Sequence, residues 1–188
     1  MASRCCRRGQ LCVRLKNKSE NMIERNALVE QLRASTLEWI ETVRLIPPAV
    51  FNQAESGGWS PAQVLMHMVL TEKGVNGILM GSADSAPPDR KPMFEIIERG
   101  LTNYEQKIIA PSFLVPRPET YDPANLLQKF KRNRDAFEEI LLNSPELDHV
   151  FHYPHPFFGT LTGMEWAYNM VLHASRHFAQ LKRVAHLS

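Results

Sequence analysis

The chain has 188 residues, of which 44% are hydrophobic and 22% charged, as in ordinary globular domains. This length predicts one domain with a sizeable core, and no apolar stretch reaches the roughly 20 residues that a membrane span needs. The formal charge of +2 is concentrated in residues 1–21, so the rest is net negative and offers no basic patch for nucleic acid. We expect a cytoplasmic protein without membrane or nucleic-acid partners.

Residues 1–21 differ in composition from the rest of the chain. They carry six basic side chains against one acidic, and they hold all three cysteines, Cys5, Cys6 and Cys12. The remaining sequence therefore has no disulfide framework and no thiolate metal site. We interpret residues 1–21 as a disordered or mis-assigned start, with Met22 as an alternative initiator and residues 22–188 as the folded domain. A transit peptide is the alternative interpretation.

The first half of the chain predicts two long helices. Apolar residues at steps near 3.6 indicate a helix from Glu20 to about Ile46, with Leu37 among its apolar positions, and Pro47-Pro48 ends it. Ser60-Pro61 combines an N-cap serine with proline at the first helical position, and predicts a second helix to about Met80.

The second half predicts one short and two long helices. The short helix begins at Met93, a long one runs from Asp122-Pro123 to Asn143, and the last runs from Gly163 to about His186. No convincing alternating run of strand length is present. The predicted fold is therefore all-α, a four-helix bundle with a short extra helix between its second and third long helices. Bundles of this type build metal sites in their cores.

Two histidines of the last helix lie on its apolar face. That face is formed by one stripe of residues at steps of three and four: Trp166, Met170, His173, His177, Leu181 and Val184. His173 and His177 are one turn apart on the core-facing side, so they can converge on one ion. The alternative is two neutral core histidines bonded to carboxylates or carbonyls.

A third histidine, His67, lies in the second turn of an otherwise apolar stretch of the second long helix. Thr71 and Gly74 share its face, and their small size leaves room beside the imidazole. Three imidazoles suit a divalent metal, zinc or nickel foremost, with iron, cobalt, manganese or copper as alternatives. Three ligands also leave a position for water or substrate, as in catalytic sites. We therefore predict a metal site formed by His67, His173 and His177.

Two stretches resemble the DinB-like family, also called the YfiT-like metal-dependent hydrolases. They are WSPAQVLMHM and HPFFGTLTGMEWAYNMVLHASRHFAQL, and the similarity extends from about Met22 to the end. The resemblance implies an up-down-down-up-like four-helix bundle, often dimeric. It also implies a divalent metal on three histidines, which fall on His67, His173 and His177. Related bundles include mycothiol-dependent isomerases and S-transferases that use bacillithiol or a similar low-molecular-weight thiol.

These observations support three hypotheses of function. The first is a metal-dependent enzyme acting on a small-molecule substrate, either a hydrolase or a transferase with a low-molecular-weight thiol as cofactor. The second is a non-catalytic metal-binding or stress-response bundle. The third is a helical interaction module with ordinary core histidines. For a hydrolase the sequence places no carboxylate as a convincing general base.

Other polar residues near these motifs have structural or open interpretations. We expect structural roles for the loop histidines, with approach of His155 to the metal site as the alternative for that residue, and solvation for two further side chains. We leave Glu165, Arg176 and Gln180 open between local structure and support of the site, and we expect three residues to line a pocket. The loop histidines are His149, His152 and His155, the solvated residues are Glu72 and His186, and the pocket residues are Thr71, Gly74 and Met170.

Overall fold

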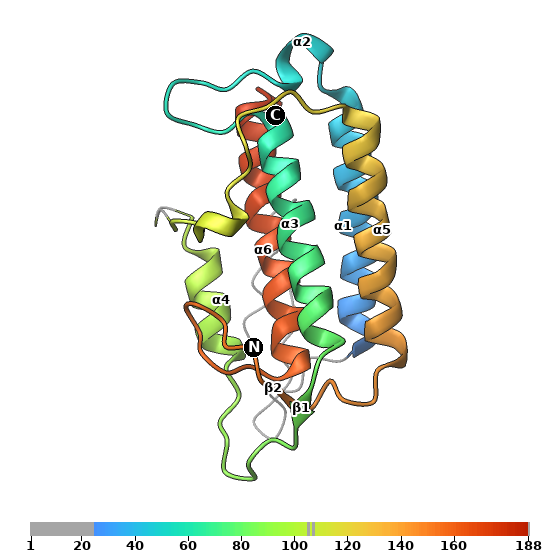
Figure 1. Ribbon diagram of the computed structural model, residues 1–188, viewed down its shortest axis with the longest axis vertical. Coiled ribbons are helices and arrows are strands. Elements are labelled where there is room, and N and C mark those ends of the chain that lie inside the picture. The colour runs from blue at the N-terminus through green and yellow to red at the C-terminus, as the bar shows by residue number, and fades with distance from the viewer. Residues whose placement is uncertain (1–24, 105, 107, 188) are drawn as a thin grey trace, which may run out of the picture.

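The computed structural model describes residues 25–104, 106 and 108–187. Helices dominate this part of the chain (Figure 1). In chain order the elements are α1 (Arg25–Leu45), α2 (Pro48–Phe51), α3 (Pro61–Leu79), β1 (Ala83–Asp84), α4 (Phe94–Thr102), the 3-10 helix η1 (Ser112–Leu114), α5 (Pro123–Asn143), β2 (Val150–Phe151) and α6 (Gly163–Val184).

The four long helices α1, α3, α5 and α6 form a bundle. α1 and α3 each pack against both α5 and α6, so α1 and α3 occupy one diagonal of the bundle. In Figure 1, α1 and α6 run upward while α3 and α5 run downward, which is the up-down-down-up order. The connection from α3 to α5 must therefore cross the length of the bundle. It carries α4, which packs against α6, and η1, which contacts α3.

The predicted helix starts are confirmed where the structure describes them. Ser60 caps α3 in a capping box with Gln63, and Asp122 caps α5 through the backbone N–H of Asn125. Thr162 and Glu165 form a second capping box at the start of α6. Each box satisfies backbone donors that a helix terminus otherwise leaves unpaired. The histidine-bearing helices α3 and α6 thus both begin at defined residues.

Four small elements, α2, η1, β1 and β2, were not predicted. Pro48 ends the first long helix but also opens the short helix α2, and η1 forms within the α4–α5 connection. β1 and β2 pair antiparallel, with Ala83 opposite Phe151 and Asp84 opposite Val150. Two-residue strands are too short to show an alternating pattern in the sequence. The start of the first predicted helix at Glu20, and the interpretation of residues 1–21, lie outside the described residues.

The core fills the space between the four long helices. Its largest fully buried side chains include Trp39, Phe130 and Tyr168. Leu37 was assigned to the apolar face of the first helix, but it is 62% exposed, because Trp39 and Val43 turn the opposite face of α1 inward. None of the helices in the described part of the chain is both long and apolar enough to cross a membrane.

Candidate metal centre

His67 enters the site from the second turn of α3. Its side chain is almost completely buried, and its ring lies 5.0 Å from the ring of Trp59. His67 Nδ1 lies 2.8 Å from the carbonyl oxygen of Leu114 in η1. A carbonyl only accepts hydrogen bonds, so Nδ1 carries the proton and donates it. The lone pair of the neutral ring is therefore on Nε2.

His173 and His177 enter from consecutive turns of α6. Their Nε2 atoms are 3.1 Å apart. His177 Nδ1 lies 2.7 Å from Gln180 Oε1, one turn further along the helix, and donates to that oxygen. His177 thus has the same tautomer as His67, with its lone pair on Nε2. His173 Nδ1 is buried and has no hydrogen-bond partner among the described residues.

The three imidazoles converge on one point between α3 and α6. One ligand atom from each of His67, His173 and His177 lies within 4.8 Å of the others, and the ring centroids are 4.4 to 5.3 Å apart. Zinc holds imidazole nitrogens at about 2.0–2.1 Å, which places two such nitrogens roughly 3 Å apart. The distance of 3.1 Å between Nε2 of His173 and Nε2 of His177 fits that requirement. The donor set and its spacing therefore suit a divalent ion.

Burial keeps these histidines in the form that binds metals. Burial lowers the pKa of His67, and it lowers the pKa of His177 to about 3. The pKa of His173 falls well below its ordinary value, first because of burial and then because of the charges that His177 and His67 would carry. All three rings are therefore neutral at neutral pH. Neutral imidazole is the ligand form, so an ion would not have to displace protons from these nitrogens.

The hydrogen-bond partners of Gln180 and Arg176, which flank His177 on α6, indicate their roles. Gln180 orients His177, as described above. Arg176 donates to the backbone carbonyls of Leu101, Asn103 and Gln106, and so ties the end of α4 to α6. Gln180 therefore supports the site directly, whereas Arg176 has a structural role.

Glu165 also has a structural role at the start of α6. Its carboxylate accepts two hydrogen bonds from Arg90, at 2.8 and 2.6 Å, and one from the backbone N–H of Met93. It closes the capping box through the N–H of Thr162 as well. These contacts hold the start of α4 against the helix that carries two of the three histidines.

His155 has structural contacts within its loop, as we expected. His155 Nδ1 accepts hydrogen bonds from the backbone N–H groups of Phe157 and Phe158, at 3.1 and 3.3 Å. Burial lowers the pKa of His155 to about 4, and His155 is also one of the charges that lower the pKa of His173. His155 therefore stabilises its loop and lies within electrostatic reach of the metal centre.

Two further histidines lie away from the site. His152 Nε2 is 2.8 Å from a carboxylate oxygen of Asp84, which links β2 and β1. The side chain of His186 is 67% exposed beside Glu55, in agreement with the predicted solvation.

The prediction that Glu72 is solvated was wrong. We expected a solvated side chain, but Glu72 is 2% exposed. It forms an ion pair with buried Arg134 of α5, with Arg134 Nε 2.6 Å from Glu72 Oε1. The sequence could not show this contact, because the partner lies 62 positions away on another helix. The prediction that Glu72 faces away from the histidines is consistent with the pair, which lies between α3 and α5.

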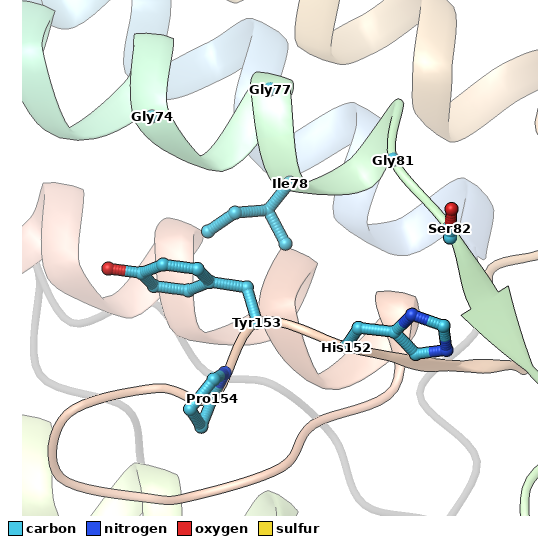
Figure 2. A pocket seen from close by; sticks show the side chains of 8 residues that line it. All are labelled: Gly74, Gly77, Ile78, Gly81, Ser82, His152, Tyr153 and Pro154. Atoms are coloured by element: carbon cyan, nitrogen blue, oxygen red, sulfur yellow. The ribbon is translucent and has the colours of Figure 1, made fainter.

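One of the three expected pocket residues lines a hollow. Gly74 lies at the edge of a hollow of about 500 Å³ between α3 and the loop after β2 (Figure 2). Met170 is buried in the core instead, and Thr71 is partly buried with its hydroxyl bonded to the His67 carbonyl. Neither Met170 nor Thr71 lines this hollow.

The fold and the site together define a class of protein. It is an all-α four-helix bundle with a cluster of three neutral histidines between two neighbouring helices, suited to a divalent ion. The sequence model of the DinB superfamily matches residues 26–181, so the chain belongs to the DinB superfamily.

A solved structure shows the same fold. YfiT from Bacillus subtilis is described as a probable metal-dependent hydrolase with an unusual four-helix bundle topology. The alignment has a TM-score of 0.56 and 14% sequence identity, and it covers 92% of this chain and 95% of the YfiT chain. None of the curated proteins matches this sequence.

Proposed function

We propose that this protein binds one divalent metal ion through His67, His173 and His177 and uses it in an enzymatic reaction on a small molecule. The observation that carries the proposal is the arrangement of the ring nitrogens. Two of the three rings donate from Nδ1 to fixed oxygens, at Leu114 and Gln180, which leaves Nε2 of each ring free as a ligand. Metal-binding histidines are typically oriented in this way.

The number of protein ligands favours catalysis over a purely structural ion. Among the described residues the cluster consists of three histidines, with no cysteine, aspartate or glutamate joining them. A structural zinc site normally has four protein ligands, whereas a catalytic site keeps one position open. When bound, the ion would act as a Lewis acid toward water or a thiol sulfur. The chain itself supplies orientation and a largely buried setting.

Two reaction types remain within this proposal. The similarity to YfiT, described as a probable metal-dependent hydrolase, supports hydrolysis. The absence of a carboxylate from the described cluster is compatible with transfer of a low-molecular-weight thiol, which needs no carboxylate base to activate water. Screening the metal-loaded protein against ester, amide and thiol-transfer substrates separates the two.

Metal content is the first test of the proposal. The full chain, without a polyhistidine tag and with Cys5, Cys6 and Cys12 changed to serine, is compared with the same chain carrying His173→Ala and His177→Ala. We expect about one zinc or nickel ion per chain in the parent and none in the variant, with unchanged helical circular dichroism. A control carrying His152→Ala and His186→Ala should keep the ion, because both side chains lie outside the cluster. Equal metal content in all three proteins would refute the site.

A further inference from the structure

The hollow beside α3 is open and is walled by two segments distant in sequence. One wall is the last turns of α3 and the residues after it, and the other is the loop that follows β2 (Figure 2). The hollow has a volume of about 500 Å³, which is enough for part of a small molecule. Its lining residues are Gly74, Gly77, Ile78, Gly81, Ser82, His152, Tyr153 and Pro154.

The hollow continues the helix face that carries His67. Positions 67, 71, 74 and 78 of a helix lie on one face, because seven residues complete about two turns. Gly74 is therefore roughly 10 Å along the helix axis from His67. Thr71, which lies between them, is only partly buried. The face of α3 thus becomes progressively more open from the histidine toward the hollow.

The opposite wall also leads back to the metal centre. Tyr153 and Pro154 line the hollow, and the next residue along the loop is His155. The His155 ring lies 5.0 Å from the ring of Trp166, which precedes His173 by seven residues, about two turns, on the same face of α6. Both walls of the hollow therefore connect to the three-histidine cluster, one through α3 and the other through the loop.

Glycines keep the α3 wall free of side chains. A Cβ atom built at Gly74 or at Gly77 would meet nothing within 4 Å, so packing within the chain does not require glycine at either position. Across the hollow, the Tyr153 ring extends along the helix toward its Gly74 end, and Ile78 points toward that ring (Figure 2). At its Gly74 end the hollow is bounded by a bare helix surface, an aliphatic side chain and an aromatic ring, whereas Ser82 and His152 lie at the opposite end (Figure 2). The walls at the Gly74 end favour a flat apolar group.

We infer that this hollow binds the apolar aromatic arm of the substrate, while the polar head of the same molecule reaches the metal. The inference rests on the proposed function and narrows its substrate class. The substrate would be an elongated small molecule whose aryl group lies about 10 Å from the group that meets the ion, as the helix spacing requires.

The test uses hydroxamic acids, which bind zinc through their head group. The zinc-loaded full chain is titrated by calorimetry with acetohydroxamic acid, which is the head alone, and with 6-phenylhexanohydroxamic acid, which adds an aryl arm of the required length. We expect the aryl compound to bind at least tenfold more tightly. In Gly77→Leu, where a side chain fills the hollow, we expect this gain to disappear while the affinity for acetohydroxamic acid is unchanged.

Two further variants complete the experiment. Tyr153→Ser removes the aromatic wall and should reduce the gain, whereas Lys73→Leu adds leucine at an exposed α3 position outside the hollow and should keep it. An equal gain in the parent and in Gly77→Leu, or no gain in the parent, would overturn the inference. Failure of acetohydroxamic acid itself to bind to the zinc-loaded chain would instead refute the open metal position that the proposed function requires, and the inference with it.

Discussion

Gln180 and the Leu114 carbonyl give His177 and His67 the same tautomer. Each oxygen accepts a hydrogen bond from an Nδ1–H group, with N···O distances of 2.7 and 2.8 Å, and each ring therefore offers Nε2 to the centre. The orientation of both rings is fixed by contacts within the chain before any ion binds. Preorganisation of this kind raises metal affinity, because less side-chain freedom is lost on binding.

A first prediction concerns Gln180. Gln180→Leu removes the acceptor of His177 Nδ1 and should weaken zinc binding by about 10- to 100-fold, the usual effect of losing such a partner. Competition with a chromophoric chelator measures the affinity. The matched control is Gln128→Leu, since Gln128 is exposed on α5. Equal affinities in the two variants would show that the Gln180 contact does not orient a ligand.

The sequence indicated which histidines lie together but not what orients them. Helical spacing placed His173 and His177 on one face, and position 67 fell on an apolar stretch of a neighbouring helix. The acceptor for His67 is a backbone carbonyl 47 positions away in a connecting segment. Every residue has a backbone carbonyl, so no residue type marks this one in advance. Contacts of this kind become visible only in the folded chain.

The buried Glu72–Arg134 ion pair does not use all of its hydrogen-bonding atoms. Glu72 Oε2 and Arg134 Nη2 are both buried and have no hydrogen-bond partner among the described residues. Burial raises the pKa of Glu72 to about 7, and Arg134 offsets this only in part. The folded state therefore holds a proton on Glu72 more tightly than the unfolded chain does.

A second prediction follows for the pH dependence of stability. Because the folded pKa is the higher one, the contribution of Glu72 to the free energy of unfolding is greatest below about pH 4.5. It declines as pH rises toward about 7, by at most roughly 1.4 kcal/mol per pH unit. Urea unfolding of the parent and of Glu72→Gln, measured from pH 5 to 8, isolates this contribution. The stability of the parent relative to the variant should fall as pH rises; an increase would contradict the raised pKa.

At the scale of elements, the long helices were predictable because their starts carry local signals. Ser60-Pro61 and Asp122-Pro123 each combine a capping side chain with a proline that suits the first helical turn. The small elements had no such signal. β1 exists only because β2, some 65 positions later, lies beside it. Pairing at that distance depends on the assembled bundle rather than on local sequence.

A third prediction contrasts two helical glycines. Gly77 is exposed, and a Cβ there would meet no atom within 4 Å, so Gly77→Ala should stabilise the fold by up to about 1 kcal/mol through helix propensity. At Gly163, the first residue of α6, a Cβ would lie 2.8 Å from the Leu147 Cα atom. Gly163→Ala should therefore destabilise the fold, by about 1–3 kcal/mol. Denaturant unfolding measures both; stabilisation by Gly163→Ala would contradict the packing.

For the whole molecule, the hydrophobic core does not depend on the metal centre. The buried side chains of the bundle pack between all four long helices, whereas the three histidines join only α3 and α6. We therefore expect the metal-free chain to remain folded. Metal binding should add stability by mass action without being required for the fold.

A fourth prediction concerns metal removal. Chelation of the zinc-loaded protein should lower its Tm by several degrees, since an ion at 100 times its Kd contributes about 2.7 kcal/mol. The helical circular dichroism at 25 °C should persist. The variant with His173→Ala and His177→Ala serves as the control and should show no change in Tm with chelator. Loss of helical signal on chelation would indicate a structural ion instead.

The homodimer implied by the family resemblance remains a prediction. Light scattering should give twice the chain mass of 21.5 kDa. A mass equal to one chain would place this protein among monomeric bundles.

The contact between His67 and Leu114 connects the metal centre to the segment that crosses the bundle between α4 and α5. The imidazole orientation and the docking of η1 against α3 are therefore thermodynamically coupled. Such coupling is reciprocal. A ligand or substitution that draws η1 away from α3 therefore lowers the affinity for the ion. Conversely, an ion bound to His67 stabilises the contact of η1 with α3. We expect this coupling to appear as slower amide hydrogen exchange at residues 112–115 in the presence of zinc.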